Sequence, residues 1–229
     1  GLKAYWRRVT PANPSHYPNG QVPGKALATL AGVTLAVADG LEFASLPAEE
    51  IAAAAQIAVW ALPGPPPWFV TLFKTRPKEV AAALNPWVLA ELQDEQPGTG
   101  IRGAFVLAMH CPAHIRRPLL DGAAQLLLQG AVKNNGVLMQ VTPALFEDGL
   151  MSQVEYDAIC LRHLESTSDT SSKLDFAWFR LWATGRPRIA WDWFKKGLLT
   201  LGADKERQSR DFAMAMAHLE WIRQPWDSE

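Results

Sequence analysis

The sequence predicts an all-α protein made of consecutive helical pairs. Apolar residues recur at helical spacing in one segment after another, and no segment alternates apolar and polar residues with the period of a strand. Arg-Pro pairs punctuate these segments at Arg76-Pro77, Arg117-Pro118 and Arg186-Pro187. The residue before a proline is biased away from helical geometry, whereas a proline is tolerated in a first turn. Each pair is therefore expected to end one helix and to begin the next.

The arrangement expected for these helices is a HEAT-like solenoid of α-α hairpins. The interval between the first two Arg-Pro pairs falls in the range of HEAT-type units. The second interval requires an enlarged unit, and the apolar positions that follow the three prolines do not align. The alternative is an irregular compact helical bundle, in which prolines begin helices for purely local reasons.

The clearest helical pair lies between residues 67 and 92. Four large apolar residues fall on one side of a short first helix, namely Trp68, Phe69, Leu72 and Phe73. A break at Thr75-Arg76 and a start at Pro77 separate it from a second helix, whose apolar stripe is Val80, Leu84, Trp87 and Val88. Neither helix buries its stripe alone, so both are expected to pack on neighbours.

The rest of the chain follows the same pattern. We expect an irregular lead-in at residues 1–21, with a helical turn at Leu2–Arg8, and a single helical-repeat domain at 22–229. The hairpins are expected at 22–62, 66–93, 100–132, 137–164 and 173–201, followed by a final helix at 205–222. A helix at Gly24–Ala38 is expected to end at Asp39-Gly40 and to bury Leu27, Leu30, Ala31 and Leu35. Ser152 and Glu155 have the spacing of a capping box.

Composition narrows the class of protein. The chain has 229 residues with a net charge of −1, which argues against a dominant nonspecific role on nucleic acid or membrane surfaces. Uncharged residues run from Ile51 to Phe73, but a proline-glycine cluster at 63–67 divides this run, so we expect no membrane span. Two cysteines and a polar, basic start at Gly1–Arg8 favour a cytoplasmic protein without a signal peptide. Because the chain begins with Gly1 rather than Met, we expect a processed product or part of a longer protein.

A resemblance to a known class of proteins is carried by three strings: Trp60-Ala61-Leu62, Pro67-Trp68-Phe69, and Arg76-Pro77-Lys78-Glu79-Val80 through Glu91-Leu92. They resemble the helical-repeat regions beyond the nucleotide-binding module of large bacterial STAND-type (NACHT-like, NLR-like) defence NTPases. The resemblance covers residues 20–95. Those families place catalysis in a P-loop module and sensing in the repeats. The resemblance therefore implies a sensor or scaffold segment for antiviral defence, without an active site of its own.

Residues with metal-binding chemistry occur in two similar pairs. Cys111 precedes His114 by three positions, and Cys160 precedes His163 by the same interval. If the two segments met, these side chains would form a tetrahedral zinc site, although both cysteines are equally typical of an apolar core. The alternative function is therefore a small all-α enzyme or zinc-dependent protein that uses His110, His114 or His163. The sequence itself assigns no catalytic residue, metal ligand or cofactor.

Two further motifs have alternative interpretations. The segment Gly20–Lys25 departs from a phosphate-binding loop in its glycine spacing and in Ala26, and is interpreted as a turn that enters a helix. Arginines near helix ends form a candidate rim at Arg102, Arg116, Arg117, Arg186 and Arg188. Trp191 is expected to be partly exposed because Trp193 already lies on the apolar stripe. The predicted interface consists of Trp191, Arg116, Arg117, Arg186 and Arg188. A protein partner is favoured, and a nucleic-acid groove is the third hypothesis.

Overall fold

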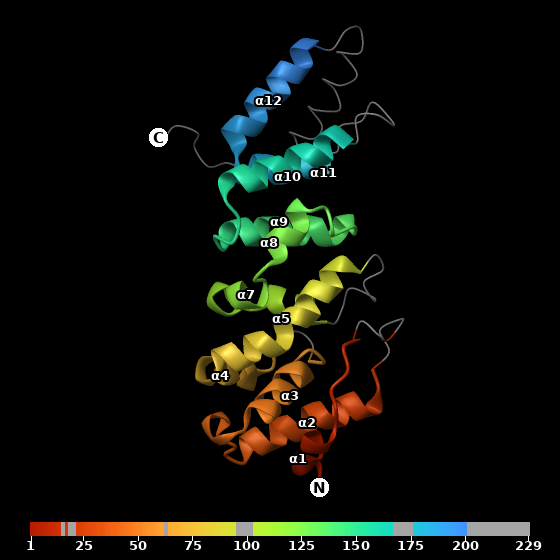
Figure 1. Cartoon of the computed structure of the whole chain (residues 1–229), viewed down its shortest axis with the longest axis vertical. Coiled ribbons are helices and arrows are strands. Elements are labelled where there is room, and N and C mark those ends of the chain that lie inside the picture. The colour runs from red at the N-terminus through yellow and green to blue at the C-terminus, as the bar shows by residue number, and fades with distance from the viewer. Residues whose placement is uncertain (15–16, 18–21, 62–63, 95–102, 167–175, 201–229) are drawn as a thin grey trace. The chain divides into compact units, whose positions relative to one another are not determined.

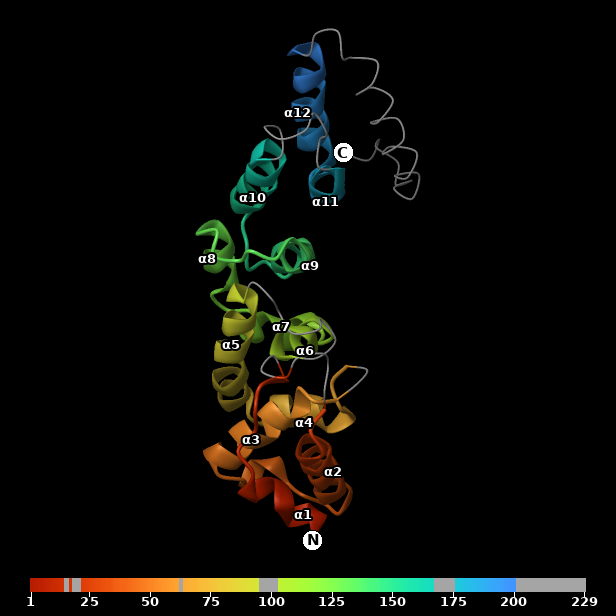
Figure 2. The same ribbon diagram turned by 90° about the vertical axis from the view of Figure 1, so that its right-hand side faces the viewer.

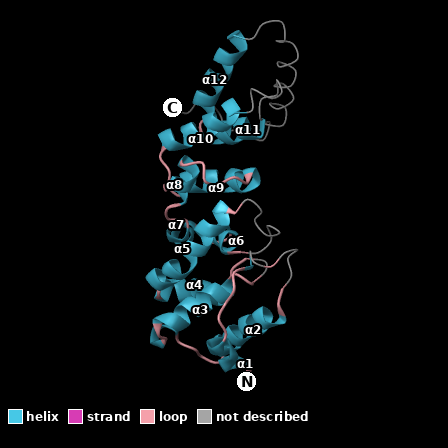
Figure 3. Cartoon of the chain, turned by 45° about the vertical axis from the view of Figure 1, so that its right-hand side comes forward, coloured by secondary structure: helices cyan, strands magenta, loops and turns pink. Residues whose placement is uncertain are grey.

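All of the regular structure in the described residues is helical. The computed structural model describes residues 1–14, 17, 22–61, 64–94, 103–166 and 176–200, except the side chains of residues 165, 166, 176, 177 and 197–200. Throughout these ranges the chain forms helices joined by loops, as Figure 3 shows. It divides into two compact units, Gly1–Leu150 and Met151–Glu229. The predicted all-α class is confirmed for the described part of the chain.

The first unit begins with a short helix that packs against a long one. α1 (Leu2–Tyr5) and the 3-10 turn η1 (Trp6–Arg8) confirm the helical turn expected there, and both contact α2 (Gly24–Ala38), as Figure 1 illustrates. Gly32 makes this contact close, because a Cβ at this position would lie 2.5 Å from the Leu2 carbonyl oxygen. Trp6 is fully buried beside it.

The bounds of α2 match the prediction, but its buried face does not. The expected stripe is wrong, because Leu27 and Leu35 are 50% and 42% exposed. The helix instead buries a set of mostly small residues, namely Ala26, Thr29, Gly32, Val33 and Ala36. The physical reason is the approach of α1, which only a face of small side chains permits.

The central pair of helices forms as predicted. α3 (Ala48–Ala58) is followed by α4 (Pro67–Thr75) and α5 (Pro77–Gln93), with Arg76 between the last two in a non-helical conformation. The four expected residues of α4 are buried, and so are three of the four expected on α5, the exception being the half-buried Trp87. Arg76 also donates to the Leu46 carbonyl oxygen at 3.0 Å, just after the 3-10 turn η4 (Phe43–Ser45). Thus the residue that ends α4 also holds the loop before α3.

A buried carboxylate connects α5 to the next helix. Glu91, only 8% exposed, accepts hydrogen bonds from the backbone N–H groups of Ala104 and Phe105 at 3.0 and 2.8 Å. These two residues begin α6 (Ala104–Met109), whose first-turn N–H groups have no partner within the helix. Glu91 therefore provides the cap that the local sequence of α6 lacks.

Short helices complete the first unit. They are α7 (Ala113–Leu119), α8 (Ala123–Leu128) and the longer α9 (Asn135–Glu147). The predicted break at Arg117-Pro118 is wrong, because both residues lie inside α7. Pro118 occupies the last turn, so it interrupts little of the helix. The Asn85 amide donates to the carbonyl oxygens of Leu119 and Asp121, at 3.1 and 2.8 Å, and so ties α5 to the end of α7.

The described helices of the second unit pack in chain order. α10 (Gln153–Ser166) contacts α11 (Phe176–Gly185), and α11 contacts α12 (Pro187–Thr200), an order that can be followed in Figure 2. The predicted capping box is confirmed: Ser152 N–H donates to Glu155 Oε2 at 2.8 Å, and Glu155 N–H donates to Ser152 Oγ at 3.3 Å. The break at Arg186-Pro187 also forms as expected. The core includes Tyr156, Ile159, Cys160, Leu164, Trp178, Phe179, Trp182, Ala190 and Phe194.

The contacts between helices and the division into two units give the grouping of the helices. α9 packs against α8, whereas α10 packs against α11, and the division between the units falls inside the predicted hairpin 137–164. The hairpin predicted at 100–132 contains three short helices. A solenoid arrangement stays a prediction, and the final helix expected at 205–222 lies outside the described residues. None of the described helices has the length and apolar content that a membrane span needs.

Candidate functional site

The outward side of α12 combines an aromatic ring with positive charge. Arg188, Trp191 and Lys195 lie at positions i, i+3 and i+7, so they follow one side of the helix. We call these three residues the α12 face. Trp191 is 38% exposed, and the nearby Ile189 is 41% exposed. The Lys195 ammonium lies 5.9 Å from the centre of the Trp191 ring, within cation–π range.

The Trp191 ring packs on the buried side chain of Phe194. It stacks on Phe194 with the ring centres 5.8 Å apart and the planes 21° from parallel. Phe194 is itself buried and contacts Phe179 of α11 at 5.5 Å. Trp193, on the other side of α12, meets Trp182 edge-on at 5.8 Å. The expected division of roles is therefore confirmed: Trp193 faces the core and Trp191 is partly exposed.

The predicted rim arginines occupy different environments, except Arg102, which lies outside the described residues. Arg116 donates to both oxygens of Asp148 at 2.6 and 2.7 Å, and Arg186 donates to Asp157 at 3.4 Å. The side chains of these two arginines are only 17% and 21% exposed, so their charge serves the fold. Arg117 and Arg188 are exposed. Arg116 and Arg117 belong to the first unit, and Arg186 and Arg188 to the second.

The cysteine–histidine pairs have the environment of core residues. Cys111 lies in the first unit and Cys160 in the second, and both are buried. Burial raises the pKa of each thiol to about 12, as is usual for a cysteine in an apolar environment. His163 stacks on Trp178 with the ring centres 4.2 Å apart, while His110 and His114 are exposed. No group of three or more potential metal ligands occurs within the described ranges.

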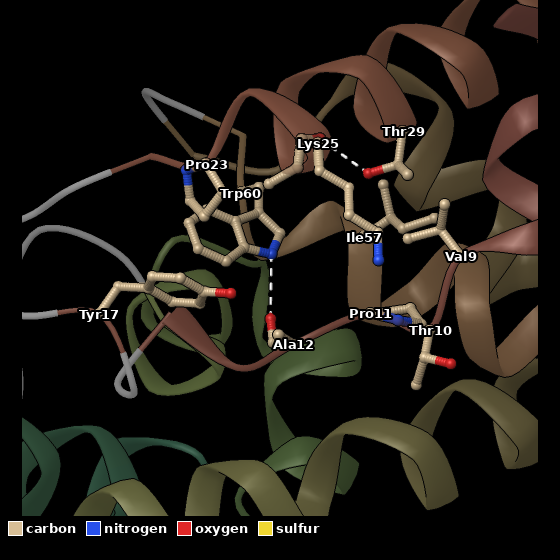
Figure 4. Close-up of a pocket in the computed structure, with 11 residues that line it drawn as sticks. Val9, Thr10, Pro11, Ala12, Tyr17, Pro23, Lys25, Thr29, Ile57 and Trp60 are labelled. Atoms are coloured by element: carbon tan, nitrogen blue, oxygen red, sulfur yellow. Dashed lines mark hydrogen bonds between the residues drawn. The ribbon is translucent and has the colours of Figure 1, made fainter.

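A small cavity lies between the lead-in and the first helices. Its volume is about 80 Å³, and Figure 4 shows the residues that line it: Val9, Thr10, Pro11, Ala12, Tyr17, Pro23, Lys25, Ala26, Thr29, Ile57 and Trp60. Trp60 Nε1 donates to the Ala12 carbonyl oxygen at 3.1 Å, and the Tyr17 ring meets Trp60 edge-on at 5.5 Å. These contacts fasten the lead-in to the end of α3.

Lys25 lines the cavity, and the sequence alone does not predict this role. It stands in the first turn of α2, and its side chain extends so that the ammonium lies beside Ile57 (Figure 4). The sequence places Lys25 only at the end of the glycine-rich stretch that it interprets as a turn. The return of residues 9–12 over α2 and α3, which creates the cavity, has no local signal in the sequence.

Comparison of the chain with protein-family models, with curated proteins and with solved structures found no match in any of the three. The geometry of the α12 face and of the cavity is therefore the basis for the proposals below.

Proposed function

We propose that this chain is a non-catalytic protein-binding module and that the α12 face contacts the partner. The observation that carries the proposal is the exposed Trp191 ring held flat on Phe194. A large aromatic side chain that is already fixed loses little conformational freedom on binding. Tryptophan and arginine are enriched at interface positions that contribute most of the binding free energy.

The surroundings of Trp191 support a protein partner. Arg188, Lys195 and Lys196 are exposed on α12, and Asp192 pairs with Lys195 at 2.8 Å. An apolar centre with charged groups around it is the usual anatomy of a protein–protein interface. A nucleic-acid groove would need a longer basic surface, yet Arg116 and Arg186 are already paired with carboxylates.

The proposal extends to the setting of the module. Two of the three strings that resemble helical-repeat regions of STAND-type defence NTPases lie at the start of α4 and along α5, which form as helices separated by Arg76. On this basis we propose a sensor or scaffold role within a larger NTPase of that kind. The full-length polypeptide should then contain a nucleotide-binding module, and its sequence tests this part of the proposal.

The binding role is tested with two matched variants. Trp191→Ala removes the fixed ring, and Val154→Ala removes an apolar side chain that is 78% exposed on α10. Each tagged protein is used to isolate its partners from the cells that produce it, and affinity for the isolated partner is then measured by calorimetry. We expect Trp191→Ala to raise the Kd by about 30-fold or more, as loss of a hot spot does, and Val154→Ala to leave it unchanged. Equal affinities for the two variants would refute the role of the α12 face.

A further inference from the structure

The cavity of the first unit is too small for a whole metabolite of ordinary size. Typical small-molecule pockets have volumes of about 300–1,000 Å³, whereas this one has about 80 Å³. It is nevertheless large enough for more than a single water molecule, which needs about 10–15 Å³ by a comparable measure. A small terminal group therefore matches it better than a cofactor or a nucleotide.

The residues that line the cavity indicate the charge of the ligand group that would fit it. Among the described residues that line it, Lys25 carries the single positive charge and none is acidic. The Lys25 ammonium points into the space beside Ile57, and the Tyr17 hydroxyl lies next to the ring of Trp60 (Figure 4). Both groups donate hydrogen bonds, so the site favours an anion over a cation.

The other residues that line the cavity indicate what the uncharged part of the ligand should be. Ile57, Trp60, Pro11 and Pro23 present mainly apolar surface. A phosphate brings two negative charges and needs several donors to replace its water, and one ammonium supplies too little. A monocarboxylate on a short aliphatic stem requires one cation and one apolar wall, which is what these residues provide.

We propose that this cavity binds a carboxylate on a short aliphatic stem. The carboxylate pairs with the Lys25 ammonium, and the stem packs against Ile57 and the ring of Trp60. The site lies in the first unit and is independent of the α12 face. The same chemistry has two sources: a free short-chain acid, or a glutamate side chain of a peptide.

The test uses sodium propionate and the indole N–H of Trp60. This N–H donates to Ala12 at the cavity wall, so its NMR signal reports on the site, and the signal is assigned by its loss in Trp60→Phe. A ligand of about five non-hydrogen atoms is expected to bind with a Kd of about 1–10 mM. Propionamide has the same shape without the charge and should bind at least about tenfold more weakly.

Variants of Lys25 connect the signal to the proposed pair. Lys25 is exposed in the first turn of α2, so its replacement should leave the fold intact. Lys25→Met keeps the aliphatic stem and should weaken propionate binding by about five- to tenfold, Lys25→Arg should retain it, and the exposed Lys78→Met of α5 serves as the control. The absence of a saturable shift, equal binding of propionate and propionamide, or unchanged binding in Lys25→Met would each overturn the proposal.

A second probe identifies the source of the carboxylate once propionate binds. N-acetylglutamate α-amide presents the same group as a side chain with a peptide backbone beside it. Binding at least about tenfold tighter than that of propionate supports a protein segment as the natural ligand. Equal or weaker binding supports a free short-chain acid.

Discussion

Asp148 is a buried carboxylate that pairs with the guanidinium of Arg116. Its side chain is 2% exposed at the end of α9, and Arg116 of α7 reaches it with two hydrogen bonds. The hydrogen bond to Asp148 raises the pKa of Arg116, with burial of the guanidinium as the opposing effect. Bidentate pairs of this kind fix both orientation and distance. The pair therefore determines how α7 and α9 meet.

Replacement of Arg116 by Met should destabilise the first unit by about 3–5 kcal/mol, because it leaves the Asp148 carboxylate buried without its partner. The free energy of unfolding, measured by urea titration with circular dichroism, checks this value. In the double variant Arg116→Met with Asp148→Asn the buried charge is gone, so most of the loss should be recovered. A double variant as unstable as the single one would contradict this account.

The position of α1 on α2 depends on one glycine. Gly32 faces the Leu2 carbonyl oxygen, and the ring of Trp6 lies 3.4 Å from the place where a Cβ would stand. Gly24, at the start of the same helix, has open space in the corresponding direction. Both glycines lie in α2, which makes them a matched pair for separating packing from helix propensity.

The Gly32→Ala variant should therefore lose about 1–3 kcal/mol of stability, since backbone atoms of α1 must move to admit the methyl group. Gly24→Ala carries the same chemical change without the clash and should change stability by less than about 1 kcal/mol. Thermal unfolding of the two proteins, followed by circular dichroism, compares them directly. Equal stabilities would mean that α1 contributes little to the packing of α2.

The capping box of α10 should respond to acid. The pKa of Glu155 lies below its ordinary value of 4.5, mainly because the Ser152 N–H donates to its carboxylate. Because folding lowers this pKa, the ionised Glu155 carboxylate stabilises the helix end above about pH 4.5. This stabilisation is lost as the pH falls through the lowered pKa. The Cα chemical shifts of Gln153 to Tyr156 should thus move toward unfolded values in acid. In Glu155→Gln the same shifts should be independent of pH.

The chain divides into two compact units, and this division should be visible in their stability. In the second unit Trp182 is 1% exposed, and its Nε1 donates to Asp157 at 2.6 Å, the same carboxylate that Arg186 contacts. Chains with more than one core need not unfold in a single transition. A substitution in one unit is then expected to change the stability of that unit and to leave the stability of the other unchanged.

The Trp182→Phe variant should raise amide hydrogen exchange in α10, α11 and α12 and leave α2 to α5 unchanged. The lost hydrogen bond to a charged acceptor corresponds to about 1.5–3 kcal/mol. Arg116→Met is the reciprocal control, because its effect should stay within the first unit. Exchange that rises equally in both units after either substitution would show that they unfold together.

The sequence by itself determined the helical class, the bounds of α2 and the break at Arg76-Pro77. It also determined the buried face of α4 and most of that of α5, where Trp87 is only half-buried, because large apolar side chains at helical spacing leave one choice of inner face. Tertiary structure decided the buried face of α2. This helix has small residues on several sides, and the packing of α1 determines which of them are buried. Tertiary structure also decided the partners of Arg116 and Arg186, which lie 32 and 29 residues away in the chain. The spacing of apolar residues within a helix does not predict such contacts, because they depend on the position of a helix end that is distant in the sequence.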